Sequence, residues 1–132
     1  MNMRGLRKRL RGAVSVEYAL ILPALLLFIL GLFDTGRLLW TYTTLNRAAE
    51  SAARCAAINT AACGTAAQVQ NFAVNEAWGL TIDASAFSVS APACGIQVQG
   101  AYDFTFVIPG LAAFTPLGTI SLKATACYPV AP

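Results

Sequence analysis

The chain has 132 residues, of which 57% are hydrophobic and only 11% charged, so it is richer in apolar residues than a typical soluble domain. This length allows one modest domain together with a membrane or targeting segment. The sequence contains no histidine, no Cys-x-x-Cys pair and no visible nucleophile–base cluster, which argues against zinc, redox and hydrolase sites. We therefore expect no metal ion or other cofactor, no enzymatic activity and no small-molecule substrate.

Residues 1–12 form a short basic leader. After Gly12 the chain has four basic residues against six acidic ones, a formal charge of −2. A basic flank before an apolar stretch predicts a cytoplasmic N-terminus and a translocated C-terminal part. This flank accounts for the basic cluster, so no nucleic-acid partner is expected. The leader holds five of the nine basic residues of the chain: Arg4, Arg7, Lys8, Arg9 and Arg11.

Residues 13–34 are almost entirely Ala, Val, Leu, Ile and Phe, and about 20 such residues in a helix cross a hydrocarbon core of about 30 Å. We expect a transmembrane helix here, because the internal Pro23 kinks such a helix without ending it. The helix continues to about Ala57, with residues 35–57 projecting from the membrane. Its polar face carries Thr41 and Thr44 beside charged residues. Apolar residues spaced by four and three mark the opposite face: Leu38, Tyr42, Leu45, Ala49, Ala52 and Ala56.

Residues 58–132 are predicted to form an extracytoplasmic α+β domain. Turn signals at Asn59 and around Gly64 precede a second helix, from about Thr65 to Trp78, with Gly79 as its C-cap. The hydrophobic period then changes to two, which predicts three antiparallel strands near residues 87–90, 96–108 and 119–128. The expected fold is pilin-like: a long N-terminal helix, a second helix and a three-stranded antiparallel sheet.

All four cysteines follow the apolar segment, and an even number in a small exported domain favours disulfides, with three possible connectivities. Cys55 and Cys63 would close the corner between the two helices. Cys94 and Cys127 would join the ends of the last two strands. Plain alternation places Cys94 on the apolar face of its strand and Cys127 on the polar face, so a bulge or an irregular strand end is needed for this pair.

Glu17 is an unusual residue in the apolar segment, because a carboxylate inside a bilayer costs about 2.5–3.5 kcal/mol even on insertion scales. It belongs to the stretch RLRGAVSVEYALILP, in which the basic leader ends at Gly12 and Glu17–Tyr18 follow four small or apolar residues. A secretory signal peptide is cleaved after its apolar region, but no such site follows Phe33. If the chain is processed, the expected site therefore lies after Gly12.

These residues resemble the prepilin-peptidase site of the tight-adherence (Tad/Flp) branch of type IV pilins. The continuation LILPALLLFILGLFDTGRLLWTYTTLNRAAESAARCAA is similar to the N-terminal region of TadE-like minor pilins, or pseudopilins. Shared features are the early Glu17, the proline in the apolar run, and an acidic residue followed by Gly-Arg at its end. Ala13 stands where mainstream type IV pilins commonly carry phenylalanine, which agrees with the tight-adherence branch.

The resemblance implies cleavage between Gly12 and Ala13 by a prepilin peptidase on the cytoplasmic side. It also implies that Glu17 and Tyr18 serve assembly, with Glu17 pairing with the new Ala13 ammonium of an adjacent subunit. The expected partners are the peptidase, other pilins, the Tad inner-membrane machinery and the membrane. The expected location is the bacterial inner membrane, with a periplasmic C-terminal domain that can enter a surface pilus.

Alternatives remain open at several of these positions. Glu17 could instead reach headgroup water or stabilise the positive helix N-terminus. Asp34 and Arg37 form either an interaction pair implied by the resemblance or a charged stop at the membrane surface. At the level of function, the alternative to a minor pilin for pilus biogenesis and adhesion is a single-pass scaffold or assembly factor that never polymerises. For Phe104, Phe106 and the loop 111–116, an exposed adhesive patch competes with core strand residues and a covered loop.

Overall fold

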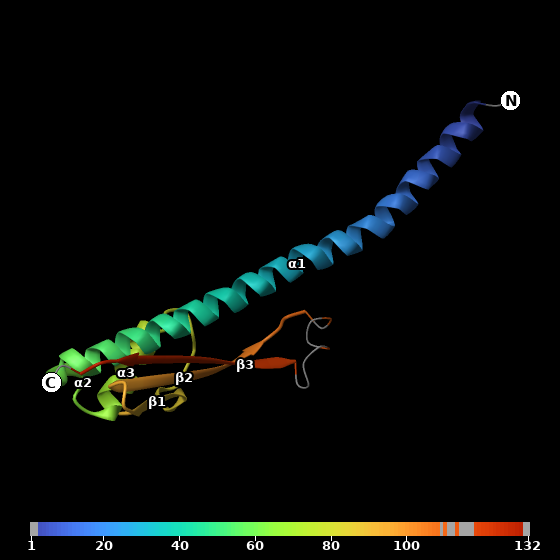
Figure 1. The fold of residues 1–132 in the computed structure, drawn as a ribbon. Helices are drawn as coiled ribbons and strands as arrows, with labels where there is room; N and C mark the ends of the chain where they lie inside the picture. Colours follow the sequence, from blue (N-terminus) through green and yellow to red (C-terminus); the bar gives the residue numbers. More distant parts are fainter. Residues whose placement is uncertain (1–2, 109, 111–112, 114–117, 131–132) are drawn as a thin grey trace.

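A computed structural model describes residues 3–108, 110, 113 and 118–130, with side chains from residue 15 onward. It has an α+β fold in which a long N-terminal helix leads into a small domain (Figure 1), as predicted. The elements in chain order are α1 (Met3–Ile58), α2 (Thr60–Cys63), α3 (Ala66–Glu76), a 3-10 turn η1 (Ala84–Ala86), β1 (Phe87–Ser90), β2 (Ile96–Thr105) and β3 (Thr119–Tyr128).

Helix α1 contains 56 residues and is therefore about 84 Å long at 1.5 Å per residue. Its N-terminal half projects away from the domain, and its C-terminal half lies along the sheet (Figure 1). The helix begins at Met3 rather than near Ala13, because the Arg, Lys and Leu residues of the leader favour helix and nothing among them ends it. Pro23 lies inside the helix, as expected.

The buried side of α1 is wider than the predicted apolar face. Thr41 and Thr44 were expected on the polar face but are buried, whereas Tyr42 was expected on the apolar face and is 46% exposed. The reason is that α1 contacts both the sheet and α3, so two neighbouring arcs of its circumference are covered. Small side chains at the covered positions allow both elements to approach closely: Ala48, Ala49, Ala52, Ala53 and Ala56.

The corner between the helices is built by caps and a disulfide. Thr65 begins α3 with a capping box, in which its hydroxyl accepts from the backbone N–H of Gln68 and the Gln68 side chain accepts from the backbone N–H of Thr65. The predicted Cys55–Cys63 disulfide is present, with the two Cα atoms 5.8 Å apart, and is called the helix-corner disulfide below. Two details differ from expectation: the short helix α2 replaces a simple turn, and α3 ends at Glu76, before the positive-φ residue Gly79.

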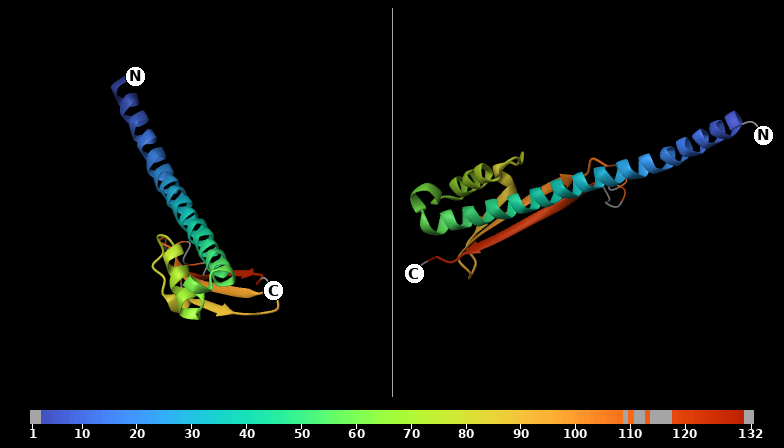
Figure 2. Two further views of the ribbon diagram at one scale, coloured as in Figure 1. Left: turned by 90° about the vertical axis from the view of Figure 1, so that its left-hand side faces the viewer. Right: turned by 90° about the horizontal axis from the view of Figure 1, so that it is seen from above.

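The sheet is antiparallel in the order β1-β2-β3, with Val98 paired to Val89 on one side and to Ala126 on the other. Buried and exposed residues alternate along β2, since α1 and α3 cover one face of the sheet (Figure 2). Gly100 is buried on that face and lets β2 approach its neighbours. A Cβ there would lie 2.8 Å from Cε1 of Phe87 and 3.0 Å from Cδ1 of Leu45.

The far end of the sheet carries the predicted Cys94–Cys127 disulfide, called the strand-end disulfide below, with Cα atoms 6.3 Å apart. Cys94 lies in the turn before β2, so the alternation of the strand does not apply to it. This irregular strand end allows the two cysteines to bond, although plain alternation would place them on opposite faces of the sheet. Gly95 shapes this turn with a φ of 126°, where a Cβ would meet the backbone of Tyr128 and Pro129.

Candidate functional site

The N-terminal half of α1 is an uncovered apolar helix. All its large hydrophobic side chains from Val16 to Phe33 are exposed, with Ile29 the least exposed at 39%. By length and composition, this helix is apolar enough to cross a membrane. The fold therefore leaves the side chains of this membrane-length segment exposed, although its C-terminal end lines two hollows together with β2 and the chain beyond it.

Glu17 lies one helical turn beyond Ala13, which corresponds to a rise of about 6 Å along α1. Glu17 is exposed and the neighbouring Tyr18 is 70% exposed. Among the side chains that the structure describes, none forms a hydrogen bond or an ion pair with Glu17. Gly12 and Ala13 have helical backbone, and their side-chain surroundings lie outside the described part. The fold thus presents this carboxylate outward.

Asp34 is the first buried side chain of α1 in the part whose side chains are described, with an exposed fraction of 2%. Arg37, one turn further on, donates from Nη1 to Oδ1 of Asp34 over 2.9 Å. The Arg37 guanidinium also lies 5.2 Å from the ring centroid of Phe104 on β2, as a cation–π contact. The structure therefore brings the predicted pair together.

The second oxygen of Asp34 has a role that the sequence did not predict. Oδ2 accepts hydrogen bonds from the backbone N–H groups of Val107 and Ile108, each over 3.0 Å. The ladder between β2 and β3 ends at Thr105 and Thr119, so these two donors have left the sheet. Asp34 therefore ties the chain beyond β2 to the helix, 73 residues earlier in the sequence.

A sequence signal for this contact existed in the spacing of α1. Extending the predicted apolar face backward from Leu38 by four residues places Asp34 on the same side as Leu45. An acidic residue on a covered face needs hydrogen-bond donors, because an unpaired buried charge is costly. The position of Asp34 thus indicated a buried partner, although the identity of that partner was not available from spacing.

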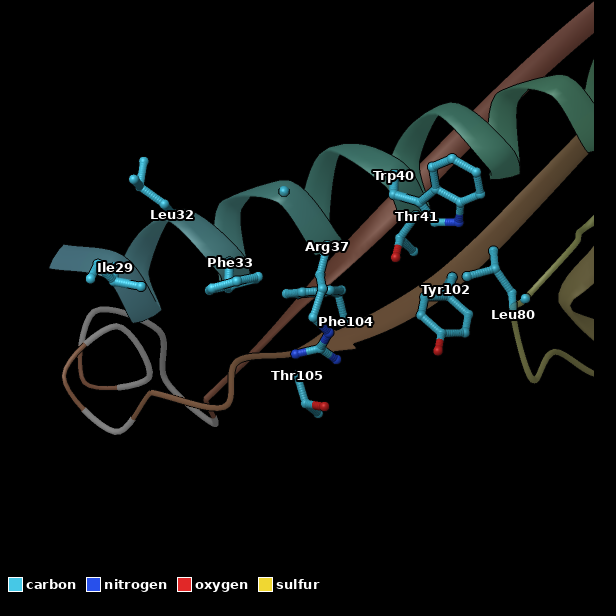
Figure 3. Close-up of a pocket in the computed structure, with 12 residues that line it drawn as sticks. Ile29, Leu32, Phe33, Arg37, Trp40, Thr41, Leu80, Tyr102, Phe104 and Thr105 are labelled. Carbon is cyan, nitrogen blue, oxygen red and sulfur yellow. The ribbon is translucent and has the colours of Figure 1, made fainter. Parts of the chain in front are cut away.

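An open groove of about 710 Å³ adjoins this junction, between α1, the loop after α3 and β2 (Figure 3). Its apolar wall is the α1 surface around Phe33, and its opposite wall is Tyr102 and Phe104 of β2. Trp40 is 63% exposed at the rim. The groove lacks a titratable cluster among its lining residues, and Arg37 is its charged side chain. Its chemistry suits an apolar or amphipathic neighbour better than a reactive substrate.

The remaining predicted residues fall outside this junction. All four cysteines are in disulfides. In the described part of the chain, no group of three or more His, Cys, Asp or Glu side chains is placed to hold a metal ion. Of the suggested adhesive patch, Phe104 is buried and packs edge-to-face on Phe106 at 5.3 Å, so it belongs to the covered side of the sheet. The loop 111–116 lies outside the described residues, apart from residue 113.

Comparison with known families identifies one segment of the chain. Residues 12–54 match the family model described as TadE-like protein. Comparison with curated proteins and with solved structures gives no match. The matched third of the chain begins at Gly12 and contains Glu17, Asp34 and Arg37. The predicted resemblance is therefore confirmed over this segment, which marks the chain as consistent with a TadE-like protein of the Tad pilus system.

Proposed function

We propose that the chain is a non-enzymatic minor pilin or pseudopilin of a Tad-type pilus, which enters or primes the pilus through its N-terminal helix. The observation that carries this proposal is the uncovered apolar half of α1 with Glu17 exposed on it. A helix of this kind requires a membrane or the helices of neighbouring subunits to cover it. The TadE-like match over the same residues supports neighbouring subunits, rather than the membrane, as the final surroundings of this helix.

Processing after Gly12 would change the charges at this end of the helix. The cut removes all five cations of the leader and creates one α-ammonium on Ala13. Glu17 then becomes the fifth residue of the mature chain. A carboxylate inside an apolar bundle is tolerable when an opposite charge pairs with it. The Ala13 ammonium of an adjacent subunit would supply that charge and would favour one axial register between subunits.

The proposed location follows from the same charge distribution. The basic leader would remain on the cytoplasmic side, residues 13–34 would cross the inner membrane, and the disulfide-bonded domain would lie in the periplasm. In this orientation the leader faces an inner-membrane prepilin peptidase. The domain faces other pilins and the surface of the growing pilus.

The proposal is tested by replacing Glu17 with glutamine, which keeps the size and removes the charge. We expect E17Q to be cleaved normally, as read by mass spectrometry of the mature N-terminus, and to be absent from sheared pili. The matched control is E50Q, because Glu50 is an exposed glutamate on the same helix beyond the apolar segment. This control should be both cleaved and incorporated.

Three results would contradict parts of the proposal. Wild-type protein that retains Met1 in cells with active pilus machinery would rule out processing after Gly12. Wild-type protein that is cleaved but found only in the membrane fraction would instead favour the non-polymerising scaffold. Normal incorporation of E17Q would remove the pairing argument while leaving cleavage intact.

A further inference from the structure

Residues 106–108 and 110, called the hairpin tip below, lie beside the apolar half of α1 rather than at the far side of the domain (Figures 1 and 2). Ile108 and Gly110 line a hollow of about 550 Å³ together with the α1 segment from Leu27 to Thr35. The two Asp34 hydrogen bonds to Val107 and Ile108 hold the tip at this height. The hairpin and the end of the apolar segment therefore occupy the same level along the helix axis.

The chemistry of this hairpin matches that of the helix beside it. Residues 104–122, which include the end of β2 and the start of β3, contain no charged side chain. Val107 points outward at the tip and is 71% exposed, although it is β-branched and apolar. The charges nearest to the tip are Asp34 and Arg37, which neutralise one another. An exposed apolar side chain beside an exposed apolar helix fits a lipid neighbour.

The backbone N–H groups of the tip have hydrogen-bond acceptors within the protein, which suits an environment with little water. Beyond Thr105 the chain has no ladder partner, and an irregular backbone is excluded from the lipid hydrocarbon unless its polar groups are satisfied. Asp34 satisfies two of them, at Val107 and Ile108, and the N–H of Phe106 donates to the carbonyl of Gly118 over 3.4 Å. The N–H groups of residues 106–108 therefore all have acceptors, as insertion at the membrane boundary requires.

We propose that the hairpin tip around Val107 is a second membrane contact, inserted into the headgroup–acyl boundary of the outer leaflet beside the transmembrane helix. This inference rests on the proposed membrane anchoring by residues 13–34. If that segment spans the bilayer, then Leu27 lies about 10 Å below Asp34 by helical rise. Because the tip contacts this same stretch, it lies within the outer boundary of the membrane.

The side chains just above the tip suit the headgroup region. Trp40 is exposed and Tyr102 is partly exposed, and both line the groove on the domain side of Phe33 (Figure 3). Trp and Tyr are enriched at membrane–water interfaces because their rings have an apolar body and a polar tip. The Arg37 side chain is 51% exposed and can reach phosphate groups while it remains paired with Asp34.

The test is depth-dependent fluorescence quenching of the full chain in phosphatidylcholine vesicles at low protein-to-lipid ratio. Trp40 and Trp78 are replaced by phenylalanine, and single tryptophans are introduced as V107W, T125W or L22W. Thr125 is an exposed residue of β3 about 20 Å from the hairpin end, and it provides the matched control. Leu22, in the middle of the apolar segment, reports whether the helix itself is inserted. Lipids brominated near the headgroup or near the acyl terminus serve as quenchers.

We expect headgroup-proximal bromine to quench V107W at least about twofold more strongly than T125W, whereas acyl-terminal bromine quenches L22W most. Equal, weak quenching of V107W and T125W with L22W strongly quenched would overturn the lipid contact and leave the anchoring intact. A blue-shifted V107W emission without bromine quenching would also overturn it, because a second copy would then cover the tip. Unquenched L22W would overturn the membrane anchoring itself, together with this inference.

Discussion

Removal of the Asp34 carboxylate should release the hairpin tip from α1. In D34A the backbone N–H groups of Val107 and Ile108 lose their acceptor, and Arg37 loses its charged partner. A hydrogen bond to a charged group contributes about 1.5–3 kcal/mol, so the two backbone bonds together hold the tip with about 3–6 kcal/mol. Because 1.36 kcal/mol changes an equilibrium constant tenfold, this loss raises the equilibrium constant for local opening of the tip by roughly a hundredfold or more.

Hydrogen exchange of the full chain in detergent micelles measures this opening residue by residue. The amides of Val107 and Ile108 should exchange at least about a hundredfold faster in D34A, while the buried ladder amide of Val98 changes much less. D34N keeps one acceptor oxygen without the charge and should show an intermediate increase. R37A should have a small effect, since this partly exposed pair contributes about 0–1 kcal/mol.

The matched control is D103A, because Asp103 is an exposed aspartate on β2 close to the same junction. Its exchange pattern should equal that of the wild type. Unchanged exchange at Val107 and Ile108 in D34A would refute the tether. So would acceleration of the same size at every β2 amide, because the carboxylate would then act on global stability alone.

Four further variants probe the packing and the crosslinks by denaturant unfolding of the full chain in micelles. G100A should lower the free energy of unfolding by about 1–3 kcal/mol, because its Cβ would overlap Phe87, and an unchanged midpoint would contradict the close approach. G36A has open space around its Cβ within a helix, so it should leave stability unchanged or raise it by up to about 1 kcal/mol, and destabilisation would show that the site is crowded. Replacing Cys94 and Cys127 by serine should lower the free energy of unfolding by about 3.7 kcal/mol, because this disulfide closes a loop of 33 residues. Removing the helix-corner disulfide, which closes a loop of 8 residues, should lower it by about 2.5 kcal/mol. The reverse order would argue against chain entropy as the main contribution.

Local sequence patterns predict the helices and strands and much of their pairing. The apolar run, the spacing of Leu45 and Ala49 by four, and the period of two after Gly79 each reflect hydrogen bonding within one element and burial of one side of it. All the residues that define such a pattern lie close together in the sequence, so the pattern can be recognised without the fold. The strand-end pairing of Cys94 with Cys127 was favoured among three connectivities, because both lie about equally far from the centre of one hairpin, and the structure confirms it.

The covered sides of α1 and the hydrogen-bond donors that Asp34 binds depend on contacts between elements that are far apart in the sequence. Thr41 became buried because two different elements contact the helix, and a period in one helix does not reveal a second contact. The Asp34 tether joins residues 73 positions apart, through backbone donors that every non-proline residue possesses. No side-chain pattern marks Val107 and Ile108 as those donors. Their position depends on where the β2–β3 ladder ends and how the sheet lies along the helix, which the folded chain as a whole determines.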